Sequence, residues 1–357
     1  MKAVDVASRR LHSHHLARPD FRTPADVVRW YGAVQAQDFL GSLYAIGLRL
    51  RAATQATVEN AIADKSIIRT WPMRGTIHYV ATEDARWMLK LLAQRGISSN
   101  RAMYRRLGLT EAVFERAHEA VEAALSGGKL LTRGEIYAAL EAAGLRSAPE
   151  QRGLHMLGYL ARHALICLGP RRGKQPTFAL LDEWAPGGRR LEGDEALAEL
   201  ARRYFISHGP ATIRDFAWWS GLTLAEAERG LRAVELSLRA LPVDGIIHWC
   251  DPKIERAAKV AAPHVRLLPA HDEFIVAYKD RGAVVHPGHA KYQLFGLGPS
   301  VLVDGRTAGT WKRTLTKDSV VVSVKPFGEL SAKERAALRQ AASHYADFVG
   351  LPLQMRP

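Results

Sequence analysis

Pairs of segments with helical spacing of apolar residues recur three times along the chain, and two short apolar runs with strand character follow each pair. The first pair, LYAIGLRL and ATVENAIADK, precedes SIIRTW and GTIHYV, which are expected to turn at Pro72–Gly75. The later hairpins are LICLGP with TFALLD, joined by Arg171–Lys174, and LSLRAL with GIIHWC, joined by Val243–Gly245. Helix, turn, helix and β-hairpin is the order of a winged-helix unit. The pattern therefore predicts three such units in series.

Capping residues mark where these helices begin and end. Thr132 with Glu135, and Thr223 with Glu226, have the spacing of a capping box, and glycines follow the expected last turns. Two further helices are expected to begin after threonine at Thr23 and Thr212.

Another helix is predicted between the second capping box and the second hairpin. Ser147-Ala148-Pro149-Glu150 is expected to cap it, and it should run to about His163. The residues expected on its apolar face are Leu154, Leu157, Leu160 and Ala161.

Beyond about Asp251 the helical pattern gives way to short alternating runs. VRLLPAHDEFIVAYKDR, SVLVDGRTAGTWKR and SVVVSVKPFG alternate apolar with polar residues, and Asp304-Gly305 is a strong signal for a two-residue hairpin turn. A last helix is predicted from Ser331, in capping-box spacing with Glu334, to about Phe348. We expect a small antiparallel sheet or partial barrel here, followed by one helix.

The predicted fold class is α+β, mostly α: three tandem winged-helix units followed by a C-terminal antiparallel β-domain and a terminal helix. At 357 residues the chain is long enough for several domains with their own cores. The expected domains are residues 1–108 (winged helix 1 with connecting helices), 109–190 (winged helix 2), 191–252 (winged helix 3) and 253–357 (β-domain plus helix).

The charge of the chain points to a polyanionic partner. Lys and Arg total 50 against 36 Asp and Glu, so the formal net charge is +14 at pH 7, which suits nucleic acid. No apolar run approaches the ~18 residues needed to span a bilayer, and the N-terminal stretch lacks the pattern of a secretory signal. Cys167 and Cys250 are too few and too far apart for a disulfide framework or a zinc site. The reducing cytoplasm fits best.

Gln35 and Gln37 are two residues apart in Val34-Gln35-Ala36-Gln37-Asp38. On extended backbone, side chains at this spacing point the same way, so two neutral amides could hold one water against a substrate without adding charge. Glutamine is mostly a surface residue, so the tripeptide by itself favours two exposed or structurally satisfied glutamines. Only other features of the chain can favour a catalytic role for these two glutamines.

Four blocks together carry a resemblance to a known family. VVRWYGAVQAQDF, RTWPMRGTIHYV, LLPAHDEFIVAYKDR and VLVDGRTAGTWKR occur in the order of the blocks of the winged-helix DNA-glycosylase family of AlkZ- and YcaQ-like enzymes, over nearly the whole chain. The resemblance implies three tandem winged helices closed by a C-terminal β-structure, in agreement with the repeat described above.

The resemblance also implies an activity and a catalytic signature. Members remove N7-alkylated purines as monofunctional glycosylases, in some cases from interstrand crosslinks, and one serves in self-resistance to a DNA crosslinker. Their signature is Gln, an apolar residue, then Gln or Asp; it falls here on Gln35, Ala36 and Gln37, which are the candidate catalytic positions. Asp38 is one residue late and is expected to face the other way, so the acid's role is not transferred to it.

Basic residues on and near the expected wings are candidate DNA contacts, because Lys and Arg at wing tips suit phosphates. The alternative for each is a solvated loop charge, or a structural role for the histidine. The candidates are Arg69, Arg74 and His78 at the first wing, Arg152, Arg171, Arg172 and Lys174 in the second unit, and Lys312 and Arg313 at the end of the C-terminal hairpin.

Other residue types favour structural roles. His12, His14 and His15 lie close in sequence, but no carboxylate or thiol completes a zinc set. Asp272 and Glu273 are expected on a strand, where adjacent side chains face opposite ways and make no acid pair. The tryptophans expected in the core rather than against a base are Trp71, Trp218, Trp219 and Trp249.

We therefore predict a DNA glycosylase for bulky or crosslinked N7-alkylated purines. It should need no metal or organic cofactor, its partner should be double-stranded DNA, and neither a membrane nor an obligate protein partner is expected. Its predicted location is the cytoplasm, on the nucleoid. The alternative is a non-catalytic winged-helix DNA-binding protein or transcription regulator, and a third possibility is a protein that binds a small molecule in its cleft. The glycosylase is distinguished from the non-catalytic DNA-binding protein by its two glutamines. In a glycosylase Gln35 and Gln37 should converge on a concave basic surface, whereas in the DNA-binding protein they should be buried in packing.

Overall fold

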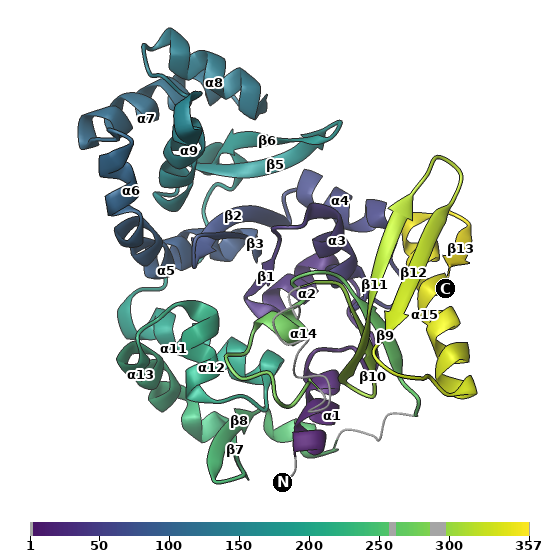
Figure 1. Cartoon of the computed structure of the whole chain (residues 1–357). Helices are drawn as coiled ribbons and strands as arrows, with labels where there is room; N and C mark the ends of the chain where they lie inside the picture. Colours follow the sequence, from purple (N-terminus) through teal and green to yellow (C-terminus); the bar gives the residue numbers. More distant parts are fainter. Residues whose placement is uncertain (1–2, 257–261, 286–297, 357) are drawn as a thin grey trace. The chain divides into compact units, whose positions relative to one another are not determined.

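The computed structural model describes residues 3–256, 262–285 and 298–356, and about half of the chain is helical (Figure 1). The chain forms two compact units. Unit 1 contains residues 1–58 and 197–357, and unit 2 contains residues 59–196. The expected mixture of helices with antiparallel strands is confirmed, although helix accounts for only about half of the chain. Within the described ranges, no helix combines the length and the apolar character needed to cross a membrane.

Unit 1 contains most of the strands. Its helices are α1 (Ala3–Ser13), α2 (Pro24–Tyr31), α3 (Phe39–Gly47), α12 (Ile213–Ser220), α13 (Leu224–Val234), α14 (Glu273–Val276) and α15 (Ala332–Val349), with 3-10 turns η3 (Glu235–Ser237) and η4 (Pro252–Arg256). Its strands are β1 (Ala33–Gln35), β7 (Arg239–Val243), β8 (Ile246–Cys250), β9 (Val265–Leu268), β10 (Ser300–Val303), β11 (Arg306–Leu315), β12 (Val320–Pro326) and β13 (Leu353–Arg356). Helices α4 (Gln55–Ala63) and α11 (Gly193–His208) contain the unit boundaries.

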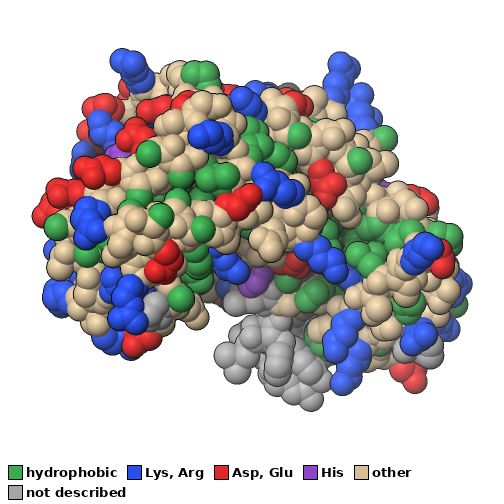
Figure 2. All heavy atoms as spheres, turned by 90° about the horizontal axis from the view of Figure 1, so that it is seen from above, with side chains coloured by type: hydrophobic (Ala, Val, Ile, Leu, Met, Phe, Trp, Pro, Cys, Tyr) green, Lys and Arg blue, Asp and Glu red, His purple; other side chains and the backbone are tan. Residues whose placement is uncertain are grey.

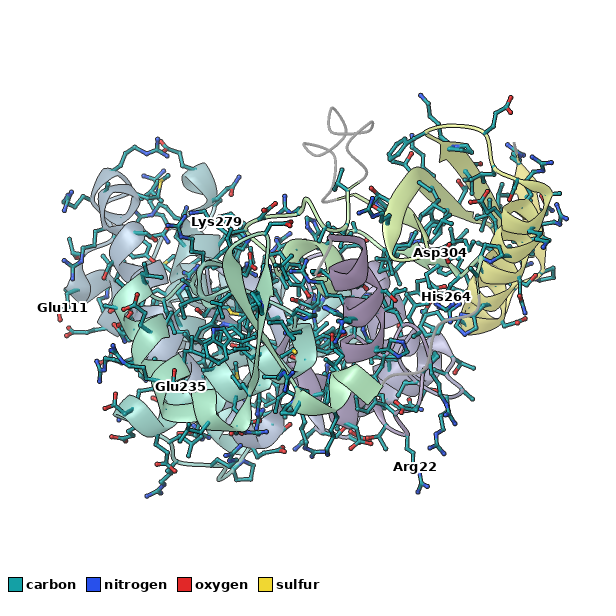
Figure 3. The ribbon with its side chains drawn as sticks, turned by 90° about the horizontal axis from the view of Figure 1, so that it is seen from below. Arg22, Glu111, Glu235, His264, Lys279 and Asp304 are labelled. Atoms are coloured by element: carbon teal, nitrogen blue, oxygen red, sulfur yellow. The ribbon has the colours of Figure 1, made fainter. Side chains whose placement is uncertain are left out.

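The C-terminal sheet of unit 1 has the strand order β13-β12-β11-β10-β9, and α15 lies along β9. The expectation of an antiparallel sheet holds for β9 to β12, whereas β13 pairs with β12 in parallel. Asp304 and Gly305 form the predicted two-residue turn, both with positive φ. The Asp304 carboxylate accepts the backbone N–H of His264 at 2.8 Å, which ties the turn to the start of β9 (Figure 3).

Aromatic rings join α3 and α15 to this sheet. The ring of Tyr44 lies 4.7 Å from that of Tyr345, which in turn lies 5.1 Å from Trp311 on β11. Gly47 permits this packing, because a Cβ there would lie 2.4 Å from the ring of Phe348. The sheet, α3 and α15 therefore share one core.

Unit 2 packs helices against five strands of a sheet. Its strands β2 (Ile67–Met73), β3 (Thr76–Ala81), β4 (Leu131–Thr132), β5 (Ile166–Arg172) and β6 (Gln175–Leu180) have the order β3-β2-β5-β6-β4. Its helices are α5 (Ala85–Ser99), α6 (Arg101–Arg106), α7 (Glu111–Leu125), α8 (Arg133–Ala142), α9 (Arg152–Arg162) and α10 (Leu181–Trp184), with 3-10 turns η1 (Thr82–Asp84) and η2 (Pro149–Gln151). Phe114, Val121, Ile136, Leu140 and Leu160 lie in its buried core.

Most of the predicted helix starts are confirmed. Capping boxes begin α2, α8, α12, α13 and α15 at Thr23, Thr132, Thr212, Thr223 and Ser331. Along the chain, α3 with α4, α8 with α9 and α12 with α13 each precede a hairpin, β2–β3, β5–β6 and β7–β8 respectively.

The helix expected to begin after Ser147 is different. Both the N–H and the hydroxyl of Ser147 bond to Glu141, so this serine closes the loop after α8 instead of capping α9. Helix α9 begins only at Arg152, and Leu154 is exposed while Met156 takes the buried position. In the first hairpin, β2 likewise extends through Met73, and the turn is only Arg74 and Gly75.

Candidate active site

Gln35 and Gln37 lie where β1 ends and the chain enters α3. Gln35 is the last residue of the strand and is 8% exposed, whereas Gln37 is exposed. The Gln35 side-chain oxygen accepts the backbone N–H of Gln37 at 2.9 Å. A backbone N–H can only donate, so the Gln35 amide must present its oxygen here. One glutamine is therefore committed to the local structure, and the other faces outward.

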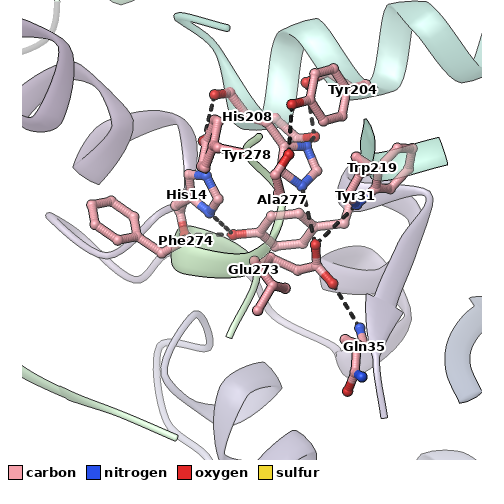
Figure 4. Close-up of polar contacts among 12 residues, drawn as sticks. His14, Tyr31, Gln35, Tyr204, His208, Trp219, Glu273, Phe274, Ala277 and Tyr278 are labelled. Atoms are coloured by element: carbon pink, nitrogen blue, oxygen red, sulfur yellow. Dashed lines mark hydrogen bonds and ion pairs between the residues drawn. The ribbon is translucent and has the colours of Figure 1, made fainter. Parts of the chain in front are cut away.

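A buried carboxylate supports the backbone of this segment. Glu273 is 2% exposed, and its Oε1 accepts the backbone N–H of Gln35 at 2.7 Å (Figure 4). Its Oε2 accepts the indole N–H of Trp219 at 3.0 Å and lies 3.6 Å from His208 Nε2. The strand that carries Gln35 is thus joined to α12 and α14 through one side chain.

The start of α14 is held by an ion pair in the core of unit 1. Asp272 caps the helix by accepting the N–H of Phe274, and Arg49 donates to both of its carboxylate oxygens. Arg49 also donates to the Tyr31 hydroxyl at 2.6 Å. Burial opposes the charge on Arg49, but the Asp272 carboxylate outweighs it and raises the pKa of the guanidinium.

Two histidines lie among the aromatic rings behind Glu273. Burial, and then the nearby His208, hold the pKa of His14 well below its ordinary value, so this imidazole is neutral. The Tyr278 hydroxyl donates to the His208 carbonyl at 2.7 Å. Its oxygen therefore accepts the Nε2–H of His14, also at 2.7 Å, and His14 Nδ1 is left to accept from Tyr31 at 3.0 Å. This network is structural, because every member is buried.

Asp38 follows the two glutamines and caps α3 by accepting the N–H of Gly41. Its carboxylate also lies 3.2 Å from the guanidinium of Arg313 on β11. Arg313, a predicted DNA contact, is therefore tied to the loop that carries Gln37. Its neighbour Lys312 is exposed.

The predicted DNA contacts on the β2–β3 hairpin are partly covered. Arg69 is 4% exposed and His78 is fully buried, with His78 Nδ1 3.0 Å from the Thr76 carbonyl. Arg74, at the turn, is half-buried and lies 3.4 Å from His78 Nε2. DNA contact by these three residues stays a prediction.

The β5–β6 hairpin presents its basic residues more openly. Arg172 and Lys174 are exposed, and Arg171 is half-buried. Arg172 is bound by the Glu135 carboxylate at 2.8 Å and by the Leu130 carbonyl at 2.7 Å. Arg152 begins α9, where its Nε donates to the Arg146 carbonyl. Figure 2 shows Lys and Arg side chains interspersed with Asp and Glu over the visible face.

The role of the two carboxylates behind the glutamines could not be predicted from the sequence. Asp272 and Glu273 were expected on a strand, but they are the N-cap and the first residue of a four-residue helix. Such a helix is too short for a periodic pattern, and its neighbours VRLL and SVLV do form strands. An Asp preceding an apolar run was the one local signal for a helix start.

The comparisons with known proteins identify the class. A model of the family described as "DNA glycosylase AlkZ-like" matches residues 28–348. The chain belongs to this family of DNA glycosylases, and the resemblance seen in the sequence is confirmed. Over 345 residues, 92% of this chain and 91% of the relative, it is 28% identical to the "Interstrand DNA cross-link repair glycosylase" of Streptomyces sahachiroi.

A solved structure extends the similarity to the fold. The "Streptomyces sahachiroi DNA glycosylase AlkZ" matches with a TM-score of 0.79 and 26% sequence identity, over 100% of both chains. The similarity therefore includes both segments of unit 1 as well as unit 2.

Proposed function

We propose that the protein hydrolyses the N-glycosidic bond of N7-alkylated purines in double-stranded DNA, including bulky or crosslinked lesions. Membership of the AlkZ-like family and the relative's name, an interstrand crosslink repair glycosylase, support this proposal. The main observation behind the proposed site is that Gln37 faces outward. It lies two residues after Gln35, whose side-chain oxygen accepts the Gln37 backbone N–H.

The chemistry suits a neutral amide. An N7-alkylated purine already carries a positive charge, so the base leaves without protonation. Cleavage passes through an oxocarbenium-like state, as in glycoside hydrolysis. Placement of a water then matters more than a strong base. In our proposal Gln37 accepts a hydrogen bond from that water, and Gln35 orients the segment, because its side-chain oxygen accepts the Gln37 backbone N–H.

We interpret the three helix pairs and their hairpins as winged-helix units that bind the duplex. The exposed basic residues Arg172, Lys174 and Lys312 support phosphate contacts, which supply affinity without reading sequence. Arg152, Arg171 and Arg313 belong to the same proposed surface set, with Arg313 held by Asp38 until DNA competes for it.

The test is single-turnover release of N7-methylguanine from a labelled duplex, and unhooking of a crosslinked duplex, by the parent protein and Gln37→Ala. Gln354→Ala, another exposed glutamine in unit 1, is the matched control. We expect loss of release in Gln37→Ala with DNA affinity retained, and parental release in the control. A parent protein that binds DNA but leaves methylated, adducted and crosslinked duplexes intact would instead be a non-catalytic DNA-binding protein.

A further inference from the structure

The carboxylate of Glu273 is fixed at both oxygens. One oxygen accepts the Gln35 N–H at 2.7 Å and the other accepts the Trp219 indole N–H at 3.0 Å. Trp219 is fully buried, and Glu273 begins a helix whose cap, Asp272, is itself clamped by Arg49. Hydrogen bonds to an ionised acceptor are shorter and stronger than neutral ones. The side chain therefore has no freedom to turn without leaving a buried N–H unpaired.

From Glu273 the contacts lead outward to the exposed glutamine. Glu273 holds the backbone of Gln35, and the Gln35 side chain holds the backbone of Gln37. Each contact uses a backbone N–H, so each fixes the course of the chain that carries the Gln37 side chain. The series Trp219–Glu273–Gln35–Gln37 reaches from the core to the surface of unit 1.

We propose that Glu273 is a positioning residue for the glycosylase reaction: it sets where the Gln37 amide meets the attacking water. This inference rests on the proposed function of Gln37. A carboxylate is required because it accepts from two N–H donors at once. A glutamine in its place has a single acceptor oxygen, and its NH2 group would face one of the two donors.

Glu273→Gln tests the proposal at nearly constant volume. We expect the single-turnover rate to fall by roughly 10- to 100-fold, the size of effect that about 1 Å of misplacement produces, with the DNA dissociation constant within about twofold of the parent. In 15N-glutamine-labelled protein, the Gln35 amide proton should move upfield, because it loses a charged acceptor. If the role of Glu273 were purely structural, Glu273→Gln would lower stability without slowing the reaction at an unchanged DNA dissociation constant.

Trp219→Phe removes one donor to the carboxylate and decides the question if Glu273→Gln does not fold. Its matched control lies in unit 2, where the Trp87 indole donates at 2.7 Å to Asp84, another buried carboxylate. We expect a slower rate in Trp219→Phe and the parental rate in Trp87→Phe. Equal slowing in both variants would overturn the proposal, because the effect would then be one of general stability.

The outcomes also separate this inference from the function on which it rests. If Gln37→Ala loses release while Glu273→Gln and Trp219→Phe keep the parental rate, the positioning role is wrong and the glycosylase site stands. If Gln37→Ala keeps the parental rate, the proposed site itself is wrong, and the role of Glu273 falls with it.

Discussion

Arg49 and Asp272 form a two-bond ion pair in the core of unit 1, although they lie 223 residues apart in the chain. Arg49 Nη1 is 2.9 Å from Oδ2 and Nη2 is 2.8 Å from Oδ1, and both side chains are almost completely buried. The pair joins the segment that follows α3 to the cap of α14, the helix that begins with Glu273.

Breaking this pair should destabilise the protein severely. Arg49→Met leaves the Asp272 carboxylate buried without its partner, which costs about 3–5 kcal/mol in the free energy of unfolding. The control is Lys90→Met, which removes an equally short but exposed pair with Glu192 and should cost less than about 1 kcal/mol. Urea unfolding of the three proteins checks this, and similar losses in both variants would contradict it.

Stability should fall as the pH drops below the ordinary histidine range. Burial holds the pKa of His14 well below its ordinary value, and it lowers that of His208 against the opposing effect of Glu273. Below about pH 6.5 the unfolded chain therefore takes up protons at these positions more readily than the folded chain. His14 adds a slope of up to about 1.4 kcal/mol per pH unit between pH 6.5 and 5, and His208 adds a slope of the same sign. Unfolding of His14→Gln over this range should show a shallower slope, and an unchanged slope would refute the assignment.

Two cations of the β5–β6 hairpin, Arg172 and Lys174, should differ in DNA binding. Lys174→Ala should reduce the slope of log K against log salt by about 0.9, the value for one phosphate contact. Arg172→Ala should change it less, because Glu135 and the Leu130 carbonyl already hold this guanidinium. Fluorescence anisotropy at several salt concentrations measures both slopes. A larger change for Arg172→Ala would show that DNA displaces Glu135.

Two helical glycines should respond in opposite ways to alanine. At Gly134 in α8 a Cβ meets nothing within 4 Å, so Gly134→Ala should stabilise the protein by up to about 1 kcal/mol. At Gly230 in α13 a Cβ would lie 2.8 Å from the Leu197 carbonyl oxygen, so Gly230→Ala should cost about 1–3 kcal/mol. Thermal unfolding of both variants tests this, and a stabilised Gly230→Ala would mean that α11 and α13 separate easily.

Local chemistry explains what the sequence predicted well. A capping box needs only a threonine or serine and an acid three residues later, so five helix starts were found from their own residues. The Asp304-Gly305 turn was found for the same reason, because two consecutive positive φ angles restrict the residues that fit. Ser147 was misassigned because Glu150 and Gln151 have positive φ, so the backbone is not helical until Arg152 and the serine lies too far from the start of α9 to cap it.

Long-range partners explain what the sequence did not predict. The two glutamines were proposed as catalytic residues from their spacing and the family resemblance, but their unequal exposure follows from tertiary contacts. Glu273 bonds to a backbone N–H 238 residues away, a relationship that no local pattern encodes. Arg69 and His78 carry the right chemistry for DNA but are buried, and the register of β2 with β3 places them on opposite faces of the hairpin.

Unit 1 is built from two segments that lie far apart in the sequence, and this affects the order in which its parts are synthesised. Gln35 emerges from the ribosome long before Glu273, and at about 5–20 residues per second the intervening chain takes roughly 10–50 s to make. All of unit 2 is translated during that interval and is continuous in sequence. The glutamine segment therefore spends this time without the carboxylate that holds it, and the proposed site cannot assemble until Glu273, about three-quarters of the way along the chain, has been translated.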